Sequence, residues 1–215
     1  MKIGVFGTGV VGNTIGSKLV QLGHEVMIGS RTRDNEKALS FVKSAGAGTS
    51  AGTFSDAAAF GKLLFNCTNG MGSLEALKLA GAMNMKGKVL IDVSNPLDFS
   101  RGFPPSLSVC NTDSLGEQIQ RAFPETSVVK TLHTVNCYLM VNPSMLQGEH
   151  DLFMCGNDPA AKVTVEDILK NWFGWKNVID LGDISNARGT EMLLPIWVRL
   201  YSKLGNANFN FHIVQ

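Results

Sequence analysis

The N-terminal segment constrains the fold of this chain more than any other. Apolar residues between positions 3 and 6 predict a buried strand, and Gly7, Gly9 and Gly12 then follow in the spacing G-x-G-x-x-G. From Val11 to Leu22, apolar residues recur every three or four positions, which predicts a helix. A strand before the glycines and a helix after them is the context that a dinucleotide-binding turn requires. The alternative is a turn that needs glycine for its backbone conformation alone.

In a dinucleotide-binding turn each glycine has a separate role. Gly7 permits the tight turn, Gly9 lets the backbone approach a pyrophosphate, and Gly12 lets the helix pack closely on the strand. The free N–H groups and the dipole of the helix N-terminus then receive the phosphate.

The end of the second predicted strand indicates which dinucleotide is bound. NAD-binding proteins usually carry Asp or Glu at this point, where the carboxylate takes the ribose 2′-OH. Here the strand at 26–28 runs into Ser30, Arg31 and Arg33, and no carboxylate is present. Because Arg binds phosphate oxygens in a bidentate way, these residues favour NADP(H). The alternative, a solvated basic turn, explains the arginines but not the missing acid.

Size and composition are those of a globular protein of one domain, or of one domain with a small appendage. The 215 residues carry 19 Lys and Arg against 18 Asp and Glu, which suggests neither nucleic acid nor an anionic membrane as a partner. A strand is expected from residue 2, so we expect no signal peptide, and no apolar run has membrane-spanning length. The four cysteines are scattered without metal-ligand spacing, which predicts no metal site. Free cysteines of this kind suit a protein located in the reducing cytoplasm.

Strands and helices alternate along the chain, which predicts an α/β, Rossmann-type, doubly wound and mostly parallel sheet. We expect residues 1–150 to form an NADP-binding Rossmann domain, and residues 151–215 to form a small C-terminal extension that completes a cleft for a second substrate. Asp158 and Pro159 predict the start of a helix there, and Pro195 predicts a kink in the last helix. Strands are expected near residues 2–6, 26–28, 47–50, 62–67, 89–93, 127–132, 151–155 and 176–180, and helices near 11–22, 34–45, 57–60, 72–82, 113–122, 159–172 and 186–204.

Ligands of open α/β sheets bind beyond the carboxyl ends of the strands. Four predicted loops qualify, namely Gly7–Gly12, Cys67–Gly72, Ser94–Leu97 and His133–Cys137. The second combines glycines with a hydroxyl and an amide, which suits close contact with a ribose or a nicotinamide. The third ends its strand in polar groups that could contact the same cofactor. Ordinary turn chemistry is the alternative for both.

His133 is the histidine expected at the end of a central strand. It could donate a hydrogen bond to a substrate carbonyl or carry a proton. The alternative is a partly buried histidine whose ring is satisfied by the backbone. Lys130, three residues earlier, is expected to extend its ammonium from the strand to solvent rather than to act in catalysis.

Several motifs spread along the chain occur together: Gly7-Thr8-Gly9 with Gly12, Gly23-His24-Glu25-Val26, Gly29-Ser30-Arg31, Val128-Val129-Lys130, His133-Thr134, Cys155-Gly156-Asn157-Asp158 and Asn208-Phe209-Asn210. Through these motifs the chain resembles the coenzyme F420-dependent NADP oxidoreductases from residue 2 to about residue 214. The stretch Ile91–Pro96 also resembles the cytosolic reductase domain of the STEAP metalloreductases, which uses a flavin.

This resemblance implies hydride transfer between NADPH and a second, flat redox cofactor that stacks against the nicotinamide. It implies that His133 faces the deazaflavin or flavin ring, which makes it the candidate catalytic residue. The residues that it assigns to the pyrophosphate are Thr8, Gly9, Val10 and Val11, and those that it assigns to the 2′-phosphate are Ser30 and Arg31. The residues that it assigns to the nicotinamide half are Cys67, Thr68, Asn69, Asn95 and Asn136.

We therefore expect a cytoplasmic NADPH-dependent oxidoreductase that transfers hydride between NADP(H) and coenzyme F420 or a flavin such as FMN or FAD. Its partners would be small redox molecules, and a homodimer is compatible with the sequence. Two other functions stay open, namely reduction of a small imine or keto acid and non-enzymatic sensing of NADP(H). Reductases of the first kind usually add a large helical domain, whereas the segment after His150 is short.

Overall fold

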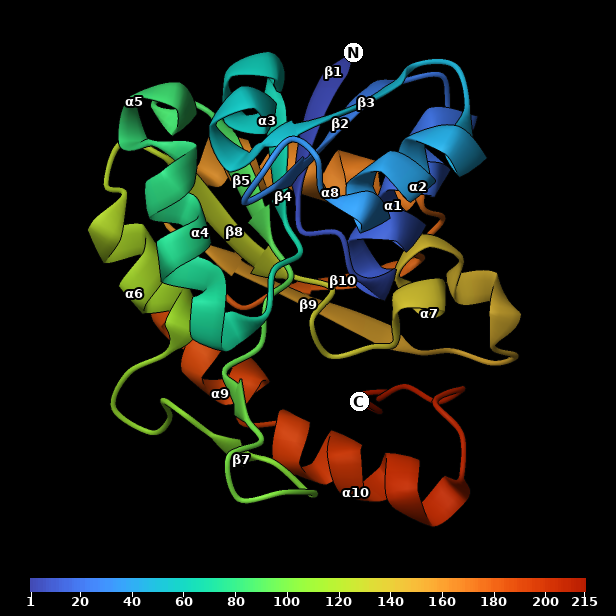
Figure 1. The fold of residues 1–215 in the computed structure, drawn as a ribbon. Coiled ribbons are helices and arrows are strands. Elements are labelled where there is room, and N and C mark those ends of the chain that lie inside the picture. The colour runs from blue at the N-terminus through green and yellow to red at the C-terminus, as the bar shows by residue number, and fades with distance from the viewer.

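A single sheet organises the molecule, and the computed structural model describes all of residues 1–215. The eight strands lie in the order β10-β9-β8-β5-β4-β1-β2-β3, and helices cover both faces (Figure 1). The strands are β1 (Lys2–Phe6), β2 (Glu25–Ser30), β3 (Thr49–Thr53), β4 (Leu63–Asn66), β5 (Val89–Asp92), β8 (Ser127–Thr131), β9 (Asp151–Gly156) and β10 (Asn177–Asp180).

The sheet is mostly parallel, which confirms the predicted Rossmann-type fold. Only β9 runs antiparallel to its inner neighbour β8, and β10 then runs parallel to β9. The strand order reverses at β1, which pairs with β2 on one side and with β4 on the other. Ligands of such sheets bind at this switch point, beyond the carboxyl ends of the strands.

The helices divide into two groups, each with its own core against one face of the sheet. The first core contains Ile15, Phe41 and Val165, and the second contains Phe54, Leu77 and Ile119. Because both faces are covered, the central strands read as continuous apolar runs. The first face carries α1 (Val10–Gln21), α2 (Glu36–Ala45), α7 (Cys137–Val141) and α8 (Pro159–Asp167); the second carries α3 (Phe54–Phe60), α4 (Ser73–Ala80), α5 (Ala82–Met85), α6 (Leu115–Ala122) and α9 (Ala187–Glu191).

The helices α5 and α7 were not predicted, and three further details differ from the sequence expectation. The third strand occupies Thr49–Thr53 rather than 47–50, and the proline-rich segment contains a small hairpin of β6 (Leu97–Asp98) and β7 (Ser106–Leu107). The last helix is not one kinked helix, because α9 ends at Glu191 and α10 (Leu194–Leu204) begins anew. Pro195 lies in the first turn of α10, where its missing N–H breaks no hydrogen bond.

The C-terminal residues turn back to the sheet after α10, which projects from the body in Figure 1. Residue 151 is the anchor of this return. The Asp151 backbone N–H donates to the Phe211 carbonyl at 2.9 Å, and the Asn210 side chain donates to the Asp151 carbonyl at 2.9 Å. Residues 151–215 therefore contribute two strands to the main sheet and a tail that covers the start of β9.

Candidate active site

The glycine turn after β1 is fixed by close contacts on two sides. Gly7 has a φ of +112°, and a Cβ there would lie 2.6 Å from the Cys67 carbonyl oxygen. A Cβ on Gly12 would lie 2.0 Å from the Gly7 carbonyl oxygen. A Cβ on Gly9, in contrast, would meet no atom within 4 Å. The fold thus requires the outer two glycines, whereas the middle one faces open space in front of α1.

The N-terminus of α1 presents unpaired backbone donors to that space. Gly9 is the N-cap and supplies no side-chain acceptor, and no acidic residue occupies the first turn. The first backbone bond of the helix runs from the Asn13 N–H to the Gly9 carbonyl at 3.0 Å, so the N–H groups of residues 10–12 have no intrahelical partner. Such donors together with the helix dipole form a binding site for a phosphate.

A cleft of about 510 Å³ extends from this turn to the carboxyl ends of β2 and β4. It joins three of the segments that the sequence singles out, although they are far apart along the chain. The residues that line the cleft are Gly7, Thr8, Gly9, Ser30, Arg31, Asn35, Phe54, Cys67, Thr68, Asn69, Gly72, Glu75 and Ala76.

The two arginines after β2 have different partners. Arg31 is exposed, lines the cleft and forms no salt bridge. Arg33 holds Asp56 through two contacts of 2.8 Å, and this pairing, with the bonds from Thr53, keeps the pKa of Asp56 well below its usual value. The buried Ser30 hydroxyl donates to the Thr32 carbonyl, so it must rotate to donate to a ligand. Arg31 is therefore the cation at this end of the cleft that has no salt-bridge partner and is free to bind a ligand.

The loop after β4 forms the opposite wall. Gly70 packs against the loop after β5 so closely that a Cβ would lie 1.9 Å from the Asn95 carbonyl oxygen. The Asn69 side chain accepts from the Met71 N–H at 3.0 Å and caps the short 3₁₀ turn at 70–72. Burial raises the pKa of the Cys67 thiol, and the charge on Asp92 raises it further. A raised pKa disfavours the nucleophilic thiolate, and Cys67 lines the cleft.

Asn95 and His133 meet where the loops after β5 and β8 approach each other. The Asn95 amide donates to the His133 carbonyl at 2.8 Å, and its own Oδ1 is buried without a hydrogen-bond partner. His133 is only 2% exposed, and its ring lies near the backbone of Thr131 and Thr190, although neither ring nitrogen makes a hydrogen bond of full geometry. Burial, together with the charge on Lys130, holds the pKa of His133 well below its ordinary value, so the imidazole is neutral.

Asn136 acts as a helix cap in this structure. Its Oδ1 accepts from the N–H groups of Tyr138 and Leu139 at the start of α7, and its amide donates to the Ala207 carbonyl. The C-terminal tail therefore reaches the loop after β8, the side on which a second substrate was expected.

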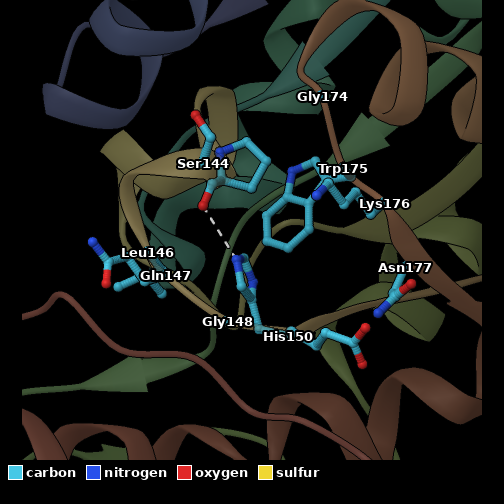
Figure 2. Close-up of a pocket in the computed structure, with 11 residues that line it drawn as sticks. Ser144, Leu146, Gln147, Gly148, His150, Gly174, Trp175, Lys176 and Asn177 are labelled. Carbon is cyan, nitrogen blue, oxygen red and sulfur yellow. Dashed lines mark hydrogen bonds between the residues drawn. The ribbon is translucent and has the colours of Figure 1, made fainter.

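A second pocket, of about 450 Å³, lies where β9 and β10 begin (Figure 2). His150 Nε2 lies 3.1 Å from the Pro143 carbonyl oxygen, and the Asn210 amide lies 3.1 Å from Nδ1. The Trp175 indole donates to the Met140 carbonyl at 3.0 Å. Since the His150 and Trp175 nitrogens already have partners, neither side chain leaves a polar atom free for a ligand. The glycine-lined cleft remains the candidate active site.

No group of three or more His, Cys, Asp or Glu side chains is arranged to hold a metal ion. None of the helices combines the length and the apolar character that crossing a bilayer requires.

The sequence profile of one family, described as NADP oxidoreductase coenzyme F420-dependent, matches residues 2–96. The chain also superposes on a crystal structure from Arthrobacter sp. FB24 that is provisionally assigned as an F420-dependent NADP reductase. The two share 50% identity over 100% of both chains, with a TM-score of 0.94. The chain belongs to the coenzyme F420-dependent NADP oxidoreductase family.

Two curated proteins are similar to this member of the family. The F420-dependent NADP reductase of Methanocaldococcus jannaschii is 29% identical over 55% of this chain and 53% of its own length. The metalloreductase STEAP3 of Rattus norvegicus is 28% identical over 91% of this chain and 38% of its own length. The matches thus span about half, or less, of these relatives. A reductive aminase from Aspergillus terreus in complex with NADPH shares the fold, with 19% identity, a TM-score of 0.64 and coverage of 95% of this chain and 62% of that one.

The structure brings most of the predicted site residues of this family member together. Those that line the cleft are Gly7, Thr8, Gly9, Ser30, Arg31, Cys67, Thr68 and Asn69, and Val10, Val11 and Gly12 form the first turn of α1 beside it. Arg33, Asn95, His133 and Asn136 do not line it. The roles of all these residues stay predictions.

The expectation for Lys130 was wrong, because its side chain is fully buried and does not reach solvent. Sequence reasoning also missed Asn35, Phe54, Glu75 and Ala76, which line the cleft. Of these, Asn35 lies at the start of the helix predicted over 34–45; the observed helix begins at Glu36, and the Asn35 side chain accepts from the Ala38 N–H as its N-cap.

Proposed function

We propose that this protein is an NADPH-dependent oxidoreductase that transfers hydride between NADP(H) and a flat redox cofactor, either coenzyme F420 or a flavin. One observation carries the proposal. A single cleft has the unpaired N–H groups of α1 at one place and the unpaired Arg31 at the end of β2, with no carboxylate between Ser30 and Arg33. This distribution of donors matches a dinucleotide with a 2′-phosphate.

The residues at the cleft fit the phosphates of NADPH. The backbone of residues 9–12 would hold the pyrophosphate, since Gly9 leaves space for it and no side chain competes for the helix N-terminus. The Arg31 guanidinium would bind the 2′-phosphate, and the Ser30 hydroxyl would add a hydrogen bond after it leaves the Thr32 carbonyl. Arg33 would contribute to binding of the 2′-phosphate only indirectly, because its guanidinium already donates two hydrogen bonds to Asp56.

The nicotinamide half would lie along the loops after β4 and β5. NADPH supplies the hydride, and the protein has to align the ring and exclude water. Thr68 and Asn69 line the cleft on this side. The buried Asn95 Oδ1 is an acceptor without a partner, and the bond to the His133 carbonyl fixes its direction, so it suits the amide N–H group of a nicotinamide.

His133 would act on the acceptor side as an orienting group. A neutral imidazole carries one N–H donor and one acceptor, and neither ring nitrogen of His133 makes a hydrogen bond of full geometry. The loop that begins with it is also tied to the C-terminal tail through Asn136 and Ala207. We therefore assign residues 151–215 to the wall behind the acceptor.

The experiment is an acceptor panel with the wild-type protein. Oxidation of NADPH is followed by its absorbance with F420, FMN, FAD, small keto acids and cyclic imines, and binding of NADPH is measured separately by calorimetry. We expect turnover with a tricyclic acceptor and little with the small substrates. Turnover confined to imines or keto acids would favour the reductive-aminase type of reaction instead. Tight binding of NADPH with no turnover on any acceptor would favour a sensor.

A further inference from the structure

Three charged side chains lie together beneath the loops of the cleft. Lys130 and Asp92 are 0% exposed and Glu191 is 1% exposed. The Lys130 ammonium contacts Asp92 Oδ2 at 2.8 Å and Glu191 Oε1 at 2.9 Å, and it donates to the Ser94 carbonyl at 2.6 Å. Its three hydrogens thus have three acceptors. These residues come from β8, β5 and α9, so the cluster joins the sheet to the C-terminal extension.

The two carboxylates of this cluster have different further partners. Glu191 accepts from the Leu115 N–H at 2.9 Å and from the Gly116 N–H at 3.0 Å, in the first turn of α6. Backbone donors and the helix dipole therefore stabilise its charge independently of Lys130. Asp92 has no such helix. Its other partners are the Ser94 hydroxyl at 2.7 Å, the Ser94 backbone N–H at 3.2 Å and the Asn66 amide at 2.8 Å, and Lys130 is the only cation beside it.

Asn66 connects Asp92 to the cleft through its hydrogen bonds. A carboxylate is an acceptor only, so the nitrogen of the Asn66 amide must face Asp92. The same nitrogen donates to the Ser73 hydroxyl at 2.6 Å, and the amide oxygen then faces the other way. There it accepts from the Thr68 hydroxyl at 2.7 Å and lies 3.4 Å from the Thr68 backbone nitrogen. Thr68 in turn lines the cleft.

We propose that Lys130 and Asp92 are positioning residues for the cofactor: they fix the orientation of the Asn66 amide, which holds Thr68 in place at the NADP(H) cleft. With an amide in place of the Asp92 carboxylate, the new Oδ1 would turn to Lys130, and the new NH₂ would face Asn66 and lose the bond from the Ser94 backbone N–H. The Asn66 amide would then have to reverse and present its nitrogen to Thr68. Thr68 would lose the Asn66 oxygen as the acceptor of its hydroxyl and its backbone N–H, and the hydroxyl would keep only the Ser73 hydroxyl at 3.1 Å.

The test compares Asp92→Asn with Glu191→Gln, which are isosteric and each remove one carboxylate from the same ammonium. Three quantities are measured: the melting temperature, the dissociation constant for NADPH, and the ¹⁵N–¹H shift of the Thr68 backbone amide without cofactor. We expect both variants to lower the melting temperature. Asp92→Asn should also weaken NADPH binding about tenfold, at the upper end of the effect of one neutral hydrogen bond, and should shift the Thr68 resonance. Glu191→Gln should leave the other two quantities nearly unchanged.

The effect on NADPH rests on the proposed function, whereas the Thr68 resonance does not. If the wild type binds no NADPH but the resonance moves only in Asp92→Asn, the proposed function fails and the coupling stands. If NADPH binds and neither variant moves the resonance or the affinity, the cluster is structural only and the inference is wrong. Equal effects of both variants on Thr68 would also overturn it, because they would reflect general loosening.

A second variant covers the case in which Asp92→Asn does not fold. Asn66→Ser leaves the Lys130–Asp92 pair intact and keeps a hydroxyl beside it, but it disconnects Thr68. We expect the same shift of the Thr68 resonance and a similar loss of NADPH affinity. In a Thr68→Val background, Asn66→Ser should have little further effect on NADPH binding, since the group that it positions is gone. Additive losses in this cycle would contradict the inference.

Discussion

The two halves of the cleft are built in different ways. The half after β1 and β2 consists of backbone N–H groups, open space at Gly9 and one exposed guanidinium on Arg31. The half after β4 and β5 consists of side chains that rest on buried polar groups, from Thr68 through Asn66 to Asp92 and Lys130. The first half depends on glycines at fixed positions, whereas the second depends on a chain of hydrogen bonds between residues distant in sequence.

This difference predicts different responses to substitution. A backbone site fails when a side chain fills its space, and the rest of the protein is unaffected. A site that rests on buried charges couples binding to stability, because a buried charge without its partner is costly. Substitutions at the open positions of the first half, Gly9 and Arg31, should therefore change affinity alone, and substitutions beneath the second half should change affinity and stability together.

The largest effect is expected for Gly9→Val. The new side chain would point into space that the fold leaves open, so the variant should fold normally while the pyrophosphate loses its place. Loss of two charge-assisted hydrogen bonds corresponds to at least about 3 kcal/mol, on the order of 100-fold in the dissociation constant for NADPH. Calorimetry and a thermal melt check both parts.

Gly189→Val is the matched control. A Cβ at Gly189 also meets no atom within 4 Å, but this residue is exposed on α9 and does not line the cleft. It should keep the wild-type affinity. Unchanged affinity in a folded Gly9→Val variant would mean that the cofactor binds elsewhere.

The next effect concerns the choice between the two nicotinamide cofactors. Arg31→Ala should weaken the binding of NADPH by about 1.5–3 kcal/mol, the range for a hydrogen bond to a charged group. It should change the binding of NADH little. Arg33→Ala should weaken NADPH less, because Arg33 is paired with Asp56 and does not line the cleft. Titrations of both cofactors against both variants decide this. A wild type that binds NADH and NADPH equally well would remove the basis for the assignment.

The first half of the cleft could be predicted from the sequence because its requirements are local. The spacing of Gly7, Gly9 and Gly12, and the absence of an acid beside Arg31, lie within short segments whose context is set by one strand and one helix. The same locality explains why the strands and the order of elements were predicted well. Boundaries moved where tertiary contacts decide them, as at α10, where the chain breaks before Pro195.

The second half could not be predicted in the same way, because its partners are brought together by strand pairing. Lys130 lies directly beside Asp92 in the register of β5 and β8. Asp92 and Lys130 are opposite charges within two apolar strands, and this pattern could have predicted a buried ion pair. It does so only once those strands are known to be neighbours. The assumption that a lysine reaches solvent fails where two carboxylates hold it inside. The role of Glu191, which follows 61 residues after Lys130, leaves no local trace in the sequence.

A smaller effect is expected at His133, and it bears on the acceptor side. If the imidazole orients the acceptor ring, His133→Phe should lower turnover by about fivefold or more, the equivalent of one hydrogen bond, while the dissociation constant for NADPH stays within about twofold. Phe keeps the buried space filled, which Ala would not. Steady-state rates with the best acceptor of the panel, beside calorimetry, test this. Full activity in the variant would leave His133 as a packing residue.

The smallest effect is a pH dependence of stability that the same histidine should cause. Burial holds the pKa of His133 well below its ordinary value in the folded protein, whereas the unfolded chain titrates near pH 6.5. Below about pH 6.5 the unfolded state therefore binds a proton that the folded state does not, and the free energy of unfolding falls as the pH decreases, by at most about 1.4 kcal/mol per pH unit. His133→Phe removes this group and leaves the other three histidines in place. Urea unfolding at pH 5.5, 6.5 and 7.5 gives the free energy of unfolding of both proteins. The value for the variant should rise relative to that of the wild type as the pH decreases. An equal pH dependence in both proteins would mean that the folded protein accepts the proton at His133.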